Sequence, residues 1–273
     1  MPFAMTGFVC ALKFGVAEIP DTGEWLLLLL QVAACMVFAR NVAMGFNRWA
    51  DRDIDAANPR TAGREIPAGV ITPARALLFV AVNAVLFVAV AASINKLTAV
   101  LSPVALAVIM FYSWCKRFTS LAHLVLGLSL GIAPAGAYIA VAGELSAIPC
   151  TLSLLVMTWC AGFDIIYALQ DAEFDRRNGL HSIPSRFSER TSLGISIALH
   201  TVSFAALMLF ASMMPQGWPL WCGCTVFTAL LVLQHVLVTP SRQRNIGIAF
   251  GTLNGIASLL FALFVIADLI IYG

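Results

Sequence analysis

Long apolar segments run through almost the whole chain and constrain its fold more than any other feature. They lie at residues 2–18, 25–46, 74–93, 97–113, 119–141, 147–169, 194–214, 218–238 and 246–270. A helix needs about 20 apolar residues to cross a bilayer. Backbone polar groups inside lipid must also be satisfied within the segment itself. The sequence therefore predicts an all-α membrane protein, with nine transmembrane helices in a bundle that forms a single domain over 1–273.

The composition supports this fold class and excludes others. Of the 273 residues, 60% are hydrophobic and 11% are charged, whereas a soluble domain carries about 25% charged residues. Such a chain has too few polar residues to cover the surface of a soluble globular enzyme. It is also too hydrophobic to be intrinsically disordered. The composition also argues against a nucleic-acid binder. A chain of this composition is expected to be embedded in a lipid membrane.

The basic residues indicate how the segments are oriented. Loops at 47–73, 114–118, 170–193 and 239–245, with Arg75 at a helix entrance, hold 13 of the 16 lysines and arginines. In a chain of nine spans these loops lie on one side, and the positive-inside rule places that side in the cytoplasm. We therefore expect a multi-pass protein of a bacterial inner membrane, with its N-terminus and its two long loops facing the cytoplasm.

The first long loop opens on polar residues repeated at every fourth position. Asn47, Asp51 and Asp55 follow the second apolar segment. On a helix that continues from this segment, the i, i+4, i+8 spacing places all three on one face. Arg60 and Arg64 come next and could offset the clustered negative charge.

A second acidic set occupies the end of the sixth apolar segment. Asp164, Tyr167, Asp171 and Asp175 again share one stripe of a helix. Asp164 lies several residues inside the apolar segment, where an ionisable side chain needs a partner. For either acidic set alone, a solvated helix end is an equally good interpretation. Two matching sets on one side of the membrane favour a functional site.

The two sets are evenly spaced along the chain. Asp51 and Asp171 are 120 residues apart, and so are Asp55 and Asp175. This spacing predicts an internal duplication of four-helix units, over 25–141 and 147–270, that brings the acidic sets face to face.

The residue types in these sets point to metal and phosphate chemistry. Oxygen ligands without histidine or cysteine suit Mg²⁺. Mg²⁺ is usually held by a few carboxylates together with substrate phosphates. Lys116 and Arg117, with Arg60 and Arg64 of the first loop, could face the same anion. Together with the membrane, they indicate an amphiphilic substrate with a diphosphate head and a lipid tail.

A cation-coupled transporter with intramembrane carboxylates is the alternative from another class. Two inverted repeats would be expected of it. Both acidic sets here lie on the same side of the membrane, which favours an enzyme.

Three motifs in these loops resemble those of the UbiA superfamily of intramembrane prenyltransferases. The motif NxxxDxxxD with a following RTxxR corresponds to Asn47, Asp51, Asp55 and Arg60–Arg64. The motif DxxYxxxDxxxD with a following GxxSxP corresponds to Asp164, Tyr167, Asp171, Asp175, Gly179, Ser182 and Pro184. The motif YxxxKR corresponds to Tyr112, Lys116 and Arg117.

The resemblance implies a central cavity capped by cytoplasmic loops and the transfer of a polyprenyl group from polyprenyl diphosphate to an aromatic acceptor. It implies Mg²⁺ ligands at Asn47, Asp51, Asp55, Asp171 and Asp175. It implies phosphate and substrate contacts at Arg60, Arg64, Tyr112, Lys116, Arg117 and Tyr167. Asp164 would orient the acceptor or shape the second metal site.

Residues 58–69 look most like the 4-hydroxybenzoate polyprenyltransferases of ubiquinone and menaquinone biosynthesis. More narrowly, they look like a bacterial subgroup tied to the futalosine route to menaquinone. Other acceptors stay open within the superfamily. These are a naphthoate or futalosine-route intermediate, haem, and a chlorophyll-type acceptor.

Overall fold

The computed structural model describes residues 1–16, 21–239 and 246–273, and this part of the chain contains helices and no strands. The bundle helices are α1 (Pro2–Phe14), α2 (Thr22–Ala50), α4 (Pro73–Ile94), α5 (Lys96–Cys115), α6 (Ala122–Ala142), α7 (Ala147–Ala168), α10 (Glu189–Ser212), α11 (Trp218–Leu237) and α12 (Asn254–Tyr272). A π-helical turn, η3 (Ile248–Leu253), leads into α12.

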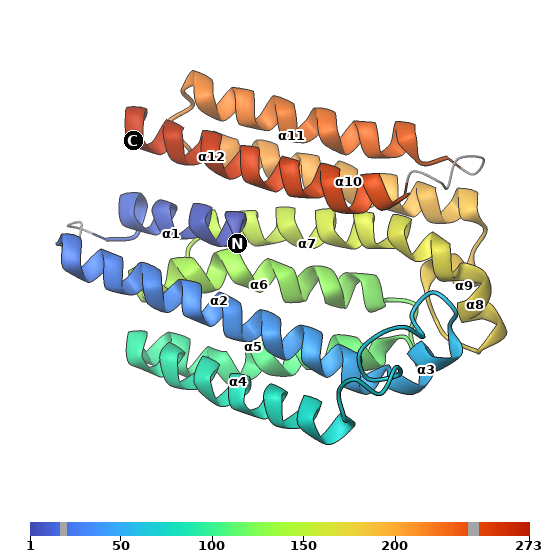
Figure 1. The fold of residues 1–273 in the computed structure, drawn as a ribbon. Coiled ribbons are helices and arrows are strands. Elements are labelled where there is room, and N and C mark those ends of the chain that lie inside the picture. Colours follow the sequence, from blue (N-terminus) through green and yellow to red (C-terminus); the bar gives the residue numbers. More distant parts are fainter. Residues whose placement is uncertain (17–20, 240–245) are drawn as a thin grey trace.

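The long helices lie side by side with their axes roughly aligned (Figure 1). Helix α7 packs against α6 and α10, α2 packs against α4 and α5, and α11 packs against α12. The short elements gather at one end of the bundle (Figure 1). They are α3 (Arg52–Ala57), the 3₁₀ turn η1 (Leu169–Asp171), α8 (Ala172–Arg177) and α9 (Ile183–Arg186).

The predicted all-α membrane fold is confirmed. Eight helices of the described chain are long and apolar enough to cross a membrane. The first predicted span is shorter than expected, because α1 has 13 residues and is therefore about 20 Å long. Residues 17–18 of that span, and the loop arginines Arg242 and Arg244, lie outside the described residues.

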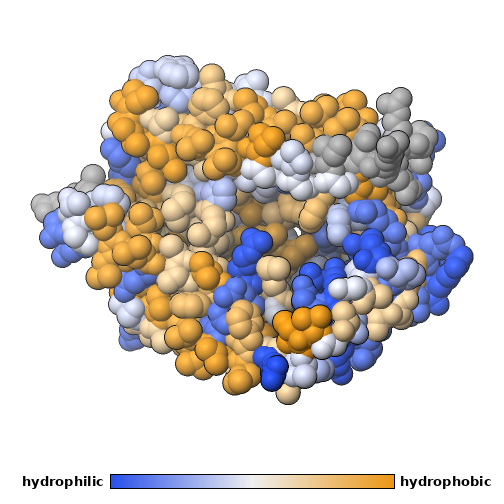
Figure 2. Space-filling model, in the orientation of Figure 1, coloured by the Kyte–Doolittle hydropathy of each residue, from blue (hydrophilic) through white to orange (hydrophobic). Residues whose placement is uncertain are grey.

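The surface matches a lipid environment. Large apolar side chains such as Leu30, Val85 and Ile270 are each more than 60% exposed, although apolar patches of this extent are rare on soluble monomers. Figure 2 shows hydrophobic side chains along the flanks of the bundle and hydrophilic ones gathered toward the end that carries the short helices. Lipid is therefore the solvent of the flanks.

The close approach of α6 and α7 depends on a glycine. A Cβ atom at Gly127 would lie 2.2 Å from the backbone oxygen of Met157, which is too close for any larger residue. Small residues permit such approaches between membrane helices. The contact lies two turns before Asp164 on α7 and sets the separation of the two helices near that residue.

Candidate active site

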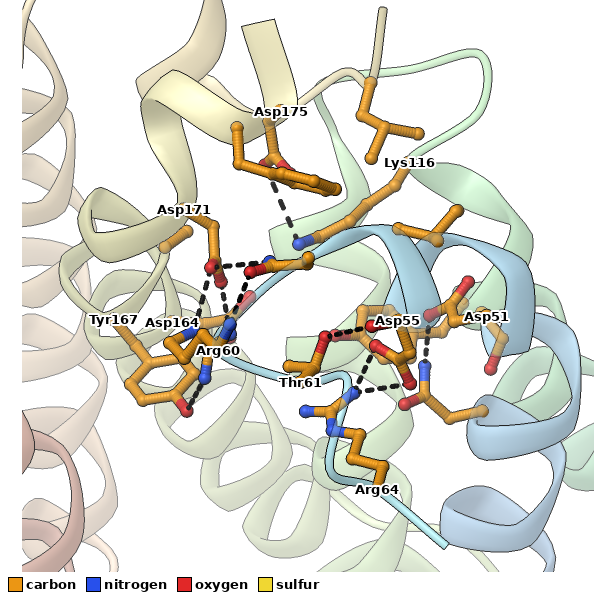
Figure 3. Close-up of a pocket in the computed structure, with 18 residues that line it drawn as sticks. Asp51, Asp55, Arg60, Thr61, Arg64, Lys116, Asp164, Tyr167, Asp171 and Asp175 are labelled. Atoms are coloured by element: carbon orange, nitrogen blue, oxygen red, sulfur yellow. Dashed lines mark hydrogen bonds and ion pairs between the residues drawn. The ribbon is translucent and has the colours of Figure 1, made fainter. Parts of the chain in front are cut away.

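A cavity of about 120 Å³ opens among the short helices at the end of the bundle. Its wall combines residues from both acidic sets with the last residues of α5 and Lys116, which follows that helix (Figure 3). The sequence-predicted residues that line it are Asn47, Asp51, Asp55, Arg60, Arg64, Tyr112, Lys116, Asp164, Tyr167, Asp171 and Asp175. Arg117 is absent from the wall and lies behind it, against Asp51.

The first acidic set keeps a helical register across the break between α2 and α3. The backbone N–H of Asp51 donates to Asn47 O at 2.9 Å, and that of Asp55 donates to Asp51 O at 2.7 Å. The side chains therefore face the same space, and Asn47 Nδ2 donates to Asp51 Oδ2 at 2.9 Å. The four-residue spacing produces this shared face.

Two arginines bind the carboxylates of the first set. Arg64 Nη1 lies 2.7 Å from Asp55 Oδ1 and 2.8 Å from Asp55 Oδ2. Arg117 Nη1 lies 3.2 Å from Asp51 Oδ1, and the same guanidinium donates to the backbone oxygens of Ala50 and Ser113. Arg117 thus connects the end of α5 to the end of α2.

Arg60 joins the first loop to the second acidic set. Its Nε donates to Asp171 Oδ1 at 2.8 Å and its Nη2 donates to Asp171 Oδ2 in a two-point contact. Its Nη1 also donates to the hydroxyl of Tyr167 at 3.0 Å. Hydrogen bonding to Asp171 raises the pKa of the Arg60 guanidinium above its ordinary value. Figure 3 shows this arginine between the two halves of the site.

Lys116 supplies the remaining cation on the wall. Its Nζ lies 3.8 Å from Asp175 Oδ2, and its backbone oxygen accepts a hydrogen bond of 2.7 Å from the N–H of His181. The loop that follows Asp175 turns at Gly179, where φ is +67°, a value that favours glycine. Ser182 then caps α9 by accepting from the N–H of Ser185. The GxxSxP sequence thus folds the second loop back against Lys116.

Asp164 has a different kind of partner. Its Oδ2 lies 2.6 Å from Nδ1 of His123 on α6, and His123 is fully buried. Nε2 of this histidine accepts a hydrogen bond of 3.3 Å from the backbone N–H of Ile183 on α9. The sequence analysis left Asp164 without a named partner. The requirement that a buried acid be paired was the available signal.

Two residues of the 58–69 stretch that were given no role in the sequence analysis also line the cavity. Asn58 donates to Asp171 Oδ1 at 3.2 Å, and its own Oδ1 accepts from the N–H of Arg60. The Thr61 hydroxyl donates to Asp55 O at 3.1 Å. Both lie within the 58–69 stretch, and their contacts tie the loop around Arg60 to Asp171 and to the backbone at Asp55.

The donor chemistry of the cavity fits a hard divalent cation. Asp51 Oδ1 and Asp175 Oδ2 are buried and accept no hydrogen bond; each has only an ion pair, with Arg117 and Lys116 respectively. Burial raises the pKa of the Asp51 carboxyl above its usual range. Among the described residues no three His, Cys, Asp or Glu side chains are close enough to hold a metal by themselves. Oxygen ligands from a bound phosphate would have to complete the coordination of Mg²⁺.

The sequence of this chain is similar to proteins named 4-hydroxybenzoate octaprenyltransferase. It is 30% identical over 252 residues to the 4-hydroxybenzoate octaprenyltransferase of Aeromonas hydrophila, across 92% of this chain and 86% of that protein. It is 32% identical over 241 residues to the 4-hydroxybenzoate octaprenyltransferase of Citrobacter koseri, across 88% of this chain and 78% of that protein.

Solved structures share the fold. An apo UbiA homologue from Aeropyrum pernix K1 has a TM-score of 0.83 at 29% identity, over 99% of this chain and 95% of that one. A UbiA homologue from Archaeoglobus fulgidus bound to DMAPP and Mg²⁺ has a TM-score of 0.71 at 19% identity, over 99% and 96%. A model of the UbiA prenyltransferase family matches residues 2–267. The chain therefore belongs to the UbiA prenyltransferase family.

Proposed function

We propose that this protein transfers a polyprenyl group from polyprenyl diphosphate to an aromatic acceptor such as 4-hydroxybenzoate, with Mg²⁺, in ubiquinone or menaquinone biosynthesis. The observation that carries the proposal is one cavity, lined by opposed aspartates and by basic residues, at the end of an apolar helical bundle. Family membership favours this chemistry over a transporter. The bacterial inner membrane, with the cavity toward the cytoplasm, is part of the proposal.

The basic residues of the cavity suit a diphosphate. Arg60, Arg64 and Lys116 line the wall, each beside an aspartate. Guanidinium and ammonium groups bind phosphate oxygens well and offset the negative charge that builds up on a leaving diphosphate. Their pairing with aspartates holds them at the cavity when no anion is bound.

The same wall carries the ligands that Mg²⁺ prefers. Asn47, Asp51, Asp55, Asp171 and Asp175 would hold the metal, and their oxygens already line one cavity. When bound with the substrate, Mg²⁺ would neutralise the diphosphate and make it a better leaving group. In the Archaeoglobus fulgidus structure, the homologue binds DMAPP together with Mg²⁺.

The apolar surroundings suit the organic half of the reaction. The prenyl group develops positive charge as the diphosphate departs, and an electron-rich ring would attack it. Wall residues such as Ile54, Phe174 and Leu180 border the cavity and would limit access of water, which would otherwise consume the cation. The octaprenyltransferase names of the relatives from Aeromonas and Citrobacter support 4-hydroxybenzoate as the first acceptor to test.

The test is an acceptor screen with purified protein and one prenyl diphosphate, with products identified by mass. We expect a prenylated aromatic acid and released diphosphate, loss of both after chelation with EDTA, and recovery on adding Mg²⁺. The panel includes 4-hydroxybenzoate, a dihydroxynaphthoate, haem and a chlorophyll precursor. No product from any acceptor, with folded protein and Mg²⁺ present, would contradict the proposal. A product from another acceptor would correct the acceptor alone.

A further inference from the structure

The cavity contains one carboxylate whose partner differs from those of the others. Of the five aspartates that line it, four lie beside an arginine or a lysine: Asp51, Asp55, Asp171 and Asp175. Asp164 is held by His123 instead. It precedes Asp171 by seven residues on the same helical path and therefore lies about 10 Å deeper in the bundle.

Hydrogen bonding determines the proton positions in this pair. The backbone N–H of Ile183 can only donate, so Nε2 of His123 must accept. The ring proton of a neutral imidazole then sits on Nδ1 and is donated to Asp164 Oδ2. A protonated histidine would present N–H groups at both nitrogens and would lose the contact with Ile183. The arrangement is therefore a neutral imidazole bound to a carboxylate.

This arrangement leaves one carboxylate oxygen available to the cavity. Asp164 lines the cavity, and its side chain is 12% exposed while that of His123 is 0% exposed. Within the described chain, Asp164 Oδ1 receives no hydrogen bond. An oxygen fixed in this way, on a carboxylate without an arginine or lysine partner, is free to accept a hydrogen bond from a ligand in the cavity.

We infer that His123 is a positioning residue, which orients Asp164 to accept a hydrogen bond from a hydroxyl group of the aromatic acceptor. The inference rests on the proposed function and extends it, because it assigns the acceptor to the inner end and the diphosphate to the outer end. The Ile183 contact adds a link between this pair and the GxxSxP loop.

Three substitutions at His123 separate its two hydrogen bonds. His123→Asn keeps a donor near the Nδ1 position, His123→Gln keeps a polar group near the Nε2 position, and His123→Leu keeps neither. A buried hydrogen bond to a charged group, once lost, leaves that charge unpaired. We therefore expect His123→Gln and His123→Leu to raise KM for the acceptor by about tenfold or more. KM for the prenyl diphosphate should change by less than about twofold, and His123→Asn should recover most of the acceptor affinity.

The matched control is the same glutamine substitution at His200. His200 is 1% exposed and lies in the bundle on α10. It contacts His235 and the backbone oxygen of Trp159 rather than the cavity. His200→Gln should leave both KM values unchanged. Thermal unfolding in detergent identifies any variant that fails to fold, and the Asn and Gln variants remain decisive if Leu is lost.

The outcomes separate this inference from the proposed function. Transfer by the wild-type protein together with wild-type acceptor KM in folded His123→Gln would overturn the role of His123. Equal loss in folded His123→Asn and His123→Gln would also overturn it, because the donor to Asp164 would then not matter. Lack of transfer by the wild-type protein would instead count against the proposed function.

Discussion

Each aspartate at the outer end of the cavity is paired with one arginine or lysine. This pairing explains how so many charged side chains are tolerated near the membrane. Asp55 is 4% exposed and Asp175 is 2% exposed. A buried carboxylate is stable only when paired or hydrogen-bonded, and Arg64 and Lys116 provide those partners. Under the proposed function, the same cations would also bind the diphosphate, so one set of ion pairs would serve both stability and substrate binding.

Two aspartates on α3 allow a controlled test of the proposed metal and diphosphate site at the outer end of the cavity. Asp55 lines the cavity, whereas the side chain of Asp53 is 84% exposed and faces away from it. Asp55→Asn removes a negative charge at the proposed metal and phosphate end, so we expect kcat to fall by about 100-fold or more. Asp53→Asn should stay within about twofold of wild type, as surface substitutions usually do. Steady-state kinetics of both variants check this, and equal rates for the two would remove Asp55 from the site.

The shared face of the first acidic set could be predicted from the sequence, because the four-residue spacing alone carries that information. Asn47, Asp51 and Asp55 need only a helix to share a face. The pair of Asp164 and His123 could not be found in this way, since 41 residues and a change of helix separate them. Arg60 was assigned to substrate, but its two-point contact with Asp171 depends on how the segment 58–72 between α3 and α4 folds. Long-range pairing of side chains is a property of the packed fold.

At the level of elements, the contact between α6 and α7 positions the pair of His123 and Asp164 at the inner end of the cavity. Gly127 and His123 lie one turn apart on α6, and Met157 and Asp164 lie two turns apart on α7. The backbone contact at Gly127 sets the separation of the helices. The same separation allows the 2.6 Å hydrogen bond between His123 and Asp164.

Two glycines of α6 test this dependence. A Cβ at Gly127 would meet backbone 2.2 Å away, whereas a Cβ at Gly136 would meet nothing within 4 Å. Alanine improves helix propensity by about 1 kcal/mol at either position. We nevertheless expect Gly127→Ala to lower the unfolding temperature in detergent by about 5 °C through overpacking. Gly136→Ala should leave it unchanged or raise it. The same unfolding temperature for both variants would show that the close approach does not limit stability.

On the scale of the whole molecule, the bundle separates two chemical environments along its axis. Apolar side chains cover the flanks, and charged residues gather at the end with the short helices (Figure 2). The spans predicted from the sequence match most helices within a few residues. Helix α10 begins earlier than the predicted start at 194, because Ser188 caps it by accepting from the N–H of Thr191. Hydropathy locates spans, but caps determine where helices begin.

The same axis predicts how the protein sits in its membrane. The cavity end holds α3, α8 and α9, and the C-terminal end of α12 lies at the opposite end (Figure 1). If the basic loops face the cytoplasm, a reporter fused after Tyr272 is outside, and one inserted at the exposed Asn178 is inside. We expect alkaline phosphatase activity from the first fusion and fluorescence of green fluorescent protein from the second, in a bacterial host. The reverse pattern would place the cavity on the outer side, where a substrate made in the cytoplasm would have to cross the membrane before it could react.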